Sequence, residues 1–190
     1  MLLAAGAGRR MGGPKALARC PDGITWVVRT ARTLAAAGCS PVLVVVGAEA
    51  ARVRRVLTGE PVVVVEATGW HEGVGASFRV GLTSLQGCAG PVAVAVVPVD
   101  TPGLTVSVVR RVAAAASEEV LRRAVYGGQP GHPIVLGRDH WAAAIASATG
   151  EIGARRYLKQ NEVVEIECSG LAVGADVDQV QQLPPGHQPG

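Results

Sequence analysis

The sequence has few aromatic residues, little charge and no long apolar run. One Phe, two Tyr and three Trp occur among 190 residues, so no aromatic platform for stacking nucleic-acid bases is indicated. The formal net charge is only +3, and no basic run with interleaved aromatics occurs, which argues against a nucleic-acid partner. The longest apolar run, residues 91–99, is far shorter than the ~20 residues of a membrane span. We therefore expect neither a nucleic-acid partner nor a membrane partner.

The four cysteines are few and widely spaced. Cys20, Cys39, Cys88 and Cys168 show no C-x-x-C spacing and no neighbouring histidines, which argues against a cysteine metal site and against a disulfide framework. No secretory signal opens the chain, because glycine and positive charge arrive by residue 10. We therefore expect reduced thiols and a cytoplasmic location.

What the sequence has in abundance is alanine, valine and glycine, with hydrophobic residues at 48%. At 190 residues the chain is long enough for one proper core. No linker or repeat interrupts it, so we assign residues 1–183 to a single domain. The tail PPGHQPG, residues 184–190, is expected to be disordered.

Valine-rich runs alternate with segments of helical periodicity in the first half of the chain. The runs at 41–47, 61–67 and 92–100 are short and almost continuously apolar, which is typical of parallel strands buried on both faces. A short first strand is expected over residues 1–4. Helices are predicted between the strands, over 24–38, 50–59 and 75–87. This β-α-β order predicts an α/β fold of three layers, with a mostly parallel, Rossmann-like sheet between helices.

The second half has a different pattern. Residues 122–136 contain two apolar runs joined by a Gly/Pro turn, which predicts a pair of strands. A further strand is expected over 163–168, and a strand running into a short helix over 171–183. Helices are predicted over 105–119, 139–147 and 151–160.

The stretch LAAGAGRRMGGPKAL, residues 3–17, concentrates four glycines and three basic residues, and it has no acid. It does not fit the dinucleotide fingerprint G-x-G-x-x-G, because Met11 stands where the third glycine is required. It does not fit the P-loop either, because Pro14 separates the glycine from the lysine. A longer loop remains, in which backbone N–H groups cradle phosphates and Arg9, Arg10 and Lys15 neutralise them. The alternative is a solvated basic loop with no ligand.

Several ordered motifs resemble those of the MobA-like NTP transferases, a family that completes molybdenum cofactors. Residues 3–15 match the signature LAAGxGxRMGxPK, and residues 69–82 are similar to W-x-EGMGSSLRAGL. Four further segments resemble the D-x-P, GHPV, GDxGAR and DIDTPEDL motifs, namely residues 96–105, 127–136, 150–158 and 174–183. The resemblance covers nearly the whole chain and implies the sheet of nucleotide-diphospho-sugar transferases.

The resemblance implies nucleotidyl transfer, in which an acceptor phosphate attacks the α-phosphorus of an NTP and pyrophosphate leaves. Such a site needs cations and close backbone approach rather than a protein nucleophile. Arg10 and Lys15 match the basic positions of the family, whereas Arg9 falls at a variable one and is expected to be exposed. Nucleotide contacts are implied at Leu3, Ala4, Ala5, Gly6, Gly8, Gly75 and Ser77.

A divalent cation, Mg²⁺, is the expected cofactor, because the triphosphate needs charge neutralisation and Mg²⁺ takes one or two protein carboxylates. Asp100 follows the most apolar run, and ligands gather at the carboxyl ends of strands in open α/β sheets. It could instead cap the next helix, but Thr105 is the better cap. The resemblance favours Asp178 as second ligand, with Asp176 as the spare.

The segment that follows Asp178 departs from the family pattern. Residues 179–182 read QVQQ where the family has TPED, so an acid is missing. This loss weakens any catalytic role for the segment and favours one alternative function, a non-catalytic protein that holds and delivers the cofactor.

The acceptor site depends on the resemblance alone. Arg79 is expected either to orient the acceptor phosphate or to pair with Glu72. His132 and Arg155 match family motifs and are expected to line the acceptor pocket. His71 stands at a variable position.

The early LAAG, the Pro14-Lys15 pair and residues 72–82 resemble the cytidylyl branch of the family. The resemblance therefore implies CTP as the nucleotide, molybdopterin as the acceptor and a molybdenum hydroxylase as the client enzyme. The alternatives are a guanylyltransferase that uses GTP and a sugar-1-phosphate nucleotidyltransferase, although the latter usually has a longer chain.

Overall fold

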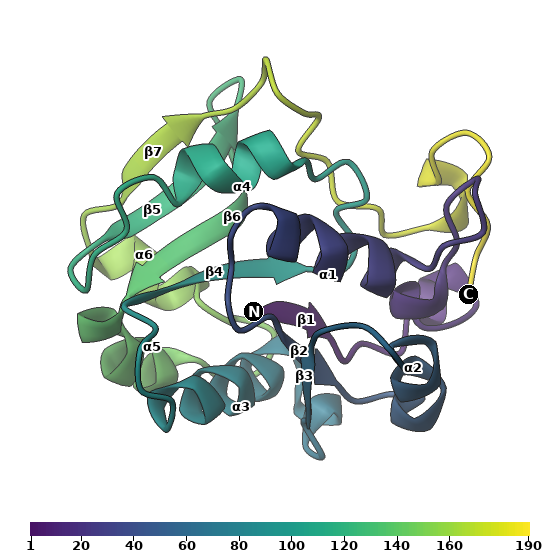
Figure 1. Cartoon of the computed structure of the whole chain (residues 1–190), viewed down its shortest axis with the longest axis horizontal. Helices are drawn as coiled ribbons and strands as arrows, with labels where there is room; N and C mark the ends of the chain where they lie inside the picture. The colour runs from purple at the N-terminus through teal and green to yellow at the C-terminus, as the bar shows by residue number, and fades with distance from the viewer.

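The computed structural model describes residues 1–190 and contains one seven-stranded sheet with helices packed against both faces (Figure 1). The strands are β1 (Leu2–Ala4), β2 (Leu43–Val46), β3 (Val63–Glu66), β4 (Ala93–Pro98), β5 (Leu121–Tyr126), β6 (Gln129–Gly137) and β7 (Val164–Glu167). The α-helices are α1 (Trp26–Ala36), α2 (Ala50–Val56), α3 (Val74–Gln86), α4 (Val106–Val112), α5 (Trp141–Ser147) and α6 (Arg155–Gln160). The 3-10 helices are η1 (Arg9–Met11), η2 (Lys15–Leu17), η3 (Trp70–Glu72), η4 (Arg138–His140) and η5 (Val180–Gln182).

The strand order is β3-β2-β1-β4-β6-β5-β7. Strands β1 to β4 are mutually parallel, β6 is antiparallel to both of its neighbours, and β7 is parallel to β5. The register places Leu2 beside Val44 on one side and Val97 on the other. The prediction of a mostly parallel, Rossmann-like sheet is therefore confirmed. The carboxyl ends of β1 and β4 lie side by side, where such folds bind ligands.

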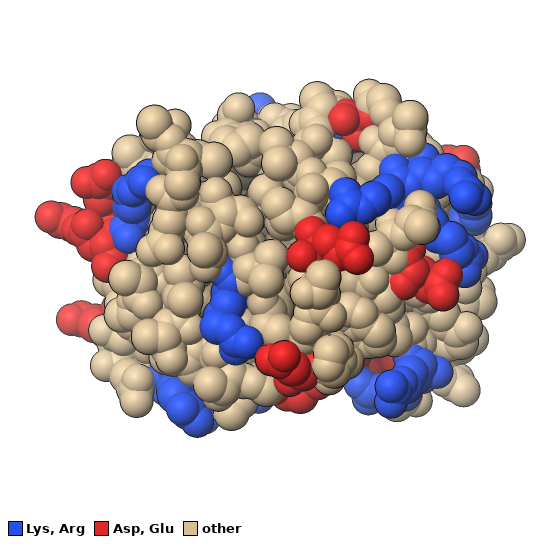
Figure 2. Space-filling view, turned by 90° about the horizontal axis from the view of Figure 1, so that it is seen from below, with Lys and Arg blue, Asp and Glu red and all other residues tan.

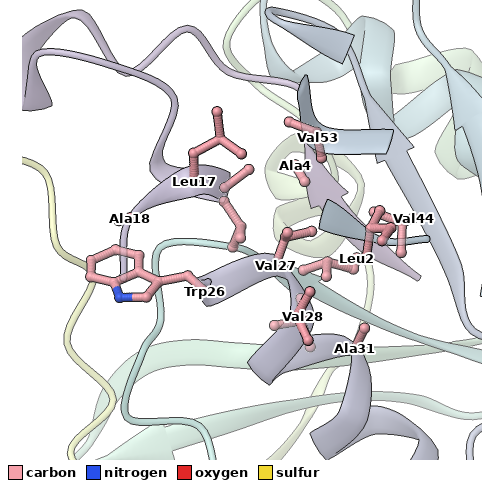
Figure 3. Packing of buried hydrophobic residues seen from close by; sticks show 14 of the residues in the cluster. Leu2, Ala4, Leu17, Ala18, Trp26, Val27, Val28, Ala31, Val44 and Val53 are labelled. Carbon is pink, nitrogen blue, oxygen red and sulfur yellow. The ribbon is translucent and has the colours of Figure 1, made fainter. Parts of the chain in front are cut away.

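The three layers follow from the alternation of side chains along the strands. Leu2 and Val44 point to the face covered by α1 and α2, whereas Leu43 and Val45 point to the face covered by α3 and α5. Figure 3 shows the first of these clusters, in which Val27 of α1 lies against Leu2 and Val44. Helix α4 covers the same face as α1, over β5 and β6.

Two elements differ from the sequence prediction because of their surroundings. Strand β3 was expected to be buried on both faces, but it lies at the edge of the sheet, and Val63 is 49% exposed. The helix expected over 105–119 ends at Val112, and Ala115 adopts a positive φ of 48°. Thr105 caps this helix as predicted, since its Oγ1 accepts a hydrogen bond from the N–H of Val108 at 3.3 Å.

The C-terminal segment also differs from prediction. No strand forms between residues 171 and 179, although the short helix is present as η5. Residues 184–190, expected to be disordered, lie against the loop before α1, where Gln188 pairs with Arg19 in an antiparallel bridge. The sequence pattern missed this contact because its partner is more than 160 residues away.

No helix of the structure is both long and apolar enough to cross a bilayer. The face drawn in Figure 2 is mostly uncharged, and its basic and acidic side chains lie close to one another.

Candidate active site

A cleft of about 440 Å³ opens where β1 and β4 end. One wall is the glycine-rich loop after β1, the opposite wall is the start of α3, and the floor carries acidic and basic side chains. The lining residues are Leu3, Ala5, Gly6, Ala7, Gly8, Arg9, Arg10, Lys15, Trp70, His71, Gly73, Val74, Ser77, Pro98, Val99, Asp100, Glu151 and Asp178.

The glycine-rich loop, residues 6–15, folds back on itself at Gly8. This residue has a φ of +59°, and a Cβ added there would overlap the carbonyl of Gly13 and lie 3.1 Å from the N atom of Lys15. The N–H of Met11 donates to the carbonyl oxygen of Gly8 at 2.7 Å. Only glycine fits this close approach, so the loop keeps the start of η2 and the end of β1 together.

Lys15 is the centre of the charged floor. Its Nζ donates to Oδ2 of Asp100 at 2.8 Å and to Oδ1 of Asp178 at 2.7 Å, and Arg10 approaches the same Asp178 oxygen at 3.4 Å. Burial alone would lower the pKa of Lys15, but its hydrogen bonds to Asp100 and Asp178 raise that pKa. The hydrogen bond from Lys15 lowers the pKa of Asp178. The lysine is therefore cationic, and its partner Asp178 is a carboxylate.

A third carboxyl, Asp176, adds negative charge to this floor. Burial, together with repulsion from Asp100 and Asp178, raises the pKa of Asp176 to about 6. Oδ1 of Asp100 is buried and has no hydrogen-bond partner. Excess negative charge and an unpartnered carboxylate oxygen are features that a divalent cation satisfies.

The donor set fits Mg²⁺ or a similar hard cation. No cluster of three or more His, Cys, Asp or Glu side chains is arranged as a complete metal cage. Asp100 and Asp178 offer oxygen ligands through a shared lysine, and Mg²⁺ usually takes only one or two protein carboxylates. Both predicted metal ligands therefore lie together, and the spare candidate, Asp176, lies close enough to be coupled to them.

The segment after Asp178 keeps its turn without the missing acid. Oε1 of Gln182 accepts hydrogen bonds from the N–H groups of Asp178 at 2.7 Å and of Gln179 at 2.9 Å. Gln179 and Gln182 form a reciprocal capping box around η5. An amide side chain thus holds the backbone of Asp178 in place.

The opposite wall is formed by η3 and the first turn of α3. Ser77, as predicted, lines the cleft, and the residue is 3% exposed. Gly75 does not line it: its N–H donates to the carbonyl oxygen of Gly150 at 2.8 Å, and an added Cβ would lie 2.9 Å from the backbone of Thr149. Gly73 packs in the same way, since a Cβ added there would lie 2.5 Å from the carbonyl group of Gly150. Both glycines therefore allow the 149–151 loop to pack against the start of α3, and Gly73 also lines the cleft.

The predicted acceptor residues do not line the cleft. Arg79 donates to the carbonyl oxygen of Ala148 at 2.7 Å and pairs with Glu72 at 3.3 Å. Pairing with Glu72 is the second of the two roles expected for Arg79. His132 is partly buried, but its Nδ1 is buried and unpartnered. Burial lowers the pKa of His132 to about 4, with Asp100 acting in the opposite direction and Arg155 in the same one. His132 and Arg155 therefore lie within electrostatic reach of the site but outside the cleft.

The remaining differences concern the cleft lining. The predicted nucleotide contacts that line the cleft are Leu3, Ala5, Gly6, Gly8 and Ser77. The other two, Ala4 and Gly75, do not line it, and Ala4 is buried in the sheet. Arg9, expected only to be exposed, lines it as well. Prediction missed Trp70 and Glu151, and it set aside His71, although all three lie in the quoted motifs beside the glycines that close the α3 wall.

Comparisons with known proteins agree with this geometry. A model of the MobA-like NTP transferase domain matches residues 1–165. Nicotine blue oxidoreductase from Paenarthrobacter nicotinovorans is 35% identical over 193 residues, which cover 96% of this chain and 93% of that protein.

Solved structures share the whole fold. A nucleotidyl transferase from Methanothermobacter thermautotrophicus superposes with a TM-score of 0.79 at 21% identity, over 95% of this chain and 91% of that one. The protein Rv0371c of Mycobacterium tuberculosis H37Rv superposes with a TM-score of 0.77 at 28% identity, over 95% and 93%. A second structure of Rv0371c is a complex with manganese, and it has a TM-score of 0.77 at 23% identity, over 95% and 92%.

Proposed function

Because the chain belongs to the MobA-like NTP transferase family and is an enzyme of the nucleotidyltransferase kind, we propose that it transfers CMP from CTP to a molybdopterin-type acceptor with Mg²⁺. The observation that carries the proposal is the charged floor. Lys15 lies between Asp100 and Asp178, at the end of a glycine-rich loop that lines the cleft. The sequence resemblance supports CTP, the pterin acceptor and a molybdenum hydroxylase client.

The reaction requires no nucleophile from the protein. An oxygen of the acceptor phosphate forms a bond to the α-phosphorus, the bond from that phosphorus to the bridging oxygen breaks, and pyrophosphate leaves with the electron pair. The acceptor oxygen is already anionic, so no proton has to be removed from it. The protein therefore acts by positioning and by charge stabilisation.

The residues of the cleft divide this work. Backbone N–H groups of the glycine loop, residues 6–15, orient the phosphates, while Arg10 and Lys15 offset the charge that develops on the leaving group. Asp100 and Asp178 would hold Mg²⁺, which supplies further charge neutralisation on the triphosphate. Ser77, buried on the opposite wall, orients the base or the ribose.

The test is pyrophosphate release by the purified protein with Mg²⁺, each NTP in turn, and molybdopterin. CTP-dependent release that is lost in Asp100→Asn supports the proposal. Pyrophosphate release that depends on GTP instead would indicate a guanylyltransferase of the same family and contradict the assignment of CTP. Nucleotide binding without release, unchanged in Asp100→Asn, contradicts catalysis at this floor and favours a delivery protein.

A redox function is the second candidate, because the 35% identical relative is named as an oxidoreductase. The chain's own redox-capable groups are four free cysteines, none of which lines the cleft. An oxidoreductase with this cleft would therefore use an electron carrier that is itself a nucleotide, held by the same glycine loop. Oxidation of a nicotinamide dinucleotide with a dye as acceptor, without pyrophosphate release, would replace nucleotidyl transfer by this function.

A further inference from the structure

The end of the chain pairs with the segment that follows the phosphate-binding loop. The N–H of Arg19 donates to the carbonyl oxygen of Gln188 at 2.9 Å, and the N–H of Gln188 donates back to Arg19 at 3.0 Å. Arg19 also forms an antiparallel bridge with Thr25. The C-terminal segment therefore forms a second isolated bridge at Arg19, two residues after the end of η2.

A side-chain contact anchors this segment next to the bridge. Nε1 of Trp26 donates to Nδ1 of His187 at 2.9 Å, and the two rings meet edge to face with centroids 5.7 Å apart. Trp26 is 1% exposed, and its backbone N–H donates to the carbonyl oxygen of Ala18 at 2.8 Å. Figure 3 shows its indole at the margin of the buried cluster, on the side of the C-terminal segment. The bond requires a neutral imidazole with its proton on Nε2.

The last residue lies directly against the phosphate-binding loop. A Cβ added at Gly190 would lie 2.7 Å from backbone atoms of Pro14, Leu17 and Ala18. A Cβ added at Gly13 would lie 2.5 Å from the carbonyl oxygen of Gly190. The last residue thus packs against the loop and the end of η2, and Figure 1 shows the C-terminus beside this N-terminal part of the chain.

Lys15 lies between these two contacts along the chain. Its side chain reaches forward to Asp100 and Asp178 in the cleft. The backbone on both sides of it is covered from behind by Gly190. Displacement of the C-terminal segment would therefore remove one of the contacts that hold this loop.

We propose that residues 184–190 form a strap that positions the phosphate-binding loop, with His187 and Gln188 as positioning residues that act through Trp26 and Arg19. The proposal rests on the proposed function, since it assigns the strap to nucleotide binding at the same loop. The strap touches no reacting atom. It keeps the loop ordered in the free protein, so that nucleotide binding does not bear the entropic cost of ordering the loop.

Two matched pairs of full-chain variants test the strap. Gln188→Pro removes the backbone N–H that donates to Arg19, whereas Gln188→Ala keeps it. His187→Phe removes the acceptor for Trp26, whereas His187→Asn supplies an oxygen near the position of Nδ1. Both positions lie outside the buried core, so the fold should survive in all four.

Two measurements are made on each variant. Hydrogen–deuterium exchange reports the ordering of residues 13–18, and calorimetric titration reports the dissociation constant of CTP with Mg²⁺. Gln188→Pro and His187→Phe should speed exchange in this segment. They should also raise the dissociation constant about tenfold, as expected for one lost hydrogen bond. Gln188→Ala and His187→Asn should stay within about twofold of wild type, and kcat at saturating CTP should not change.

Unchanged exchange in both disruptive variants overturns the strap. Faster exchange with an unchanged dissociation constant makes the segment structural only, and it too overturns the proposal. Equal effects of proline and alanine at position 188 would exclude the backbone bridge as the cause. If the wild-type protein binds no nucleotide, the proposed function fails instead, and the strap is then judged by exchange alone.

Discussion

Replacing Lys15 with methionine tests the charged floor most directly. The change keeps the length of the side chain but removes the cation that contacts Asp100 at 2.8 Å and Asp178 at 2.7 Å. The lysine side chain is 15% exposed, and those of its partners are 22% and 44% exposed. The variant therefore leaves two carboxylates, with Asp176 beside them, in a partly desolvated site without their main counter-charge.

The size of the effect lies between two limits. Exposed ion pairs contribute about 0–1 kcal/mol, whereas removing one partner of a fully buried pair costs about 3–5 kcal/mol. Partial exposure of both partners places Lys15→Met at about 2 kcal/mol of lost stability. For a chain of this length, that corresponds to a fall in Tm of roughly 4–8 °C. The same change should lower kcat/KM for nucleotidyl transfer by roughly 30- to 1000-fold, or about 2–4 kcal/mol.

A divalent cation should reverse the loss of stability. In the wild type, Lys15 neutralises the same two carboxyl groups that would ligate Mg²⁺, so the variant should gain more stability from the cation than the wild type does. Thermal unfolding followed by circular dichroism, with chelator and with Mg²⁺, measures this difference. Lys159→Met, at the chain's other lysine, is the matched control and should behave as wild type. An unchanged Tm in chelator, or equal stabilisation of both proteins by Mg²⁺, would refute the reasoning.

Three further predictions concern the loop, the turn and pH. Gly8→Ala should cost at least ~1 kcal/mol of stability and weaken CTP binding, because Gly8 has a positive φ and is in close contact with the rest of the loop. Gly12 also has a positive φ but lies in open space, so Gly12→Ala should keep CTP binding. Calorimetric titration with CTP distinguishes the two variants. Gln182→Ala removes the acceptor of two backbone N–H groups and should lower kcat/KM about tenfold in a steady-state assay, whereas Gln181→Ala should not. Hydrogen bonds lower the pKa of Glu167 from 4.5 to about 2. The stability this adds is present above pH 4.5 and lost as the pH falls through 2, so the Tm difference from Glu167→Gln should vanish in acid.

The strands and most helices could be predicted because their signals are local. Residues 43–46 are all buried, as an unbroken valine-rich run indicates for a parallel strand. The cap at Thr105 was readable for the same reason, since its bond reaches only to Val108. The exposed β3 was not readable, because edge position depends on which strands pair and not on the strand's own residues.

The candidate site divides in the same way. Arg10, Lys15 and Asp100 stand in motifs that can be identified one at a time, and all three line the cleft. Gly75 was predicted to contact the nucleotide, because a glycine in the sequence indicates close packing but not which group packs against it. In the structure that partner is the 149–151 loop.

The sequence alone determined the α/β class, the glycine-rich loop after β1 and the acidic residue after β4, because each depends on residues that are neighbours along the chain. Only the tertiary structure decided that Lys15 contacts Asp178, 163 positions away, and that Gly190 packs against the loop. Such contacts are selected by the packing of the whole chain, which offsets the entropy of closing these long loops. No local pattern records them.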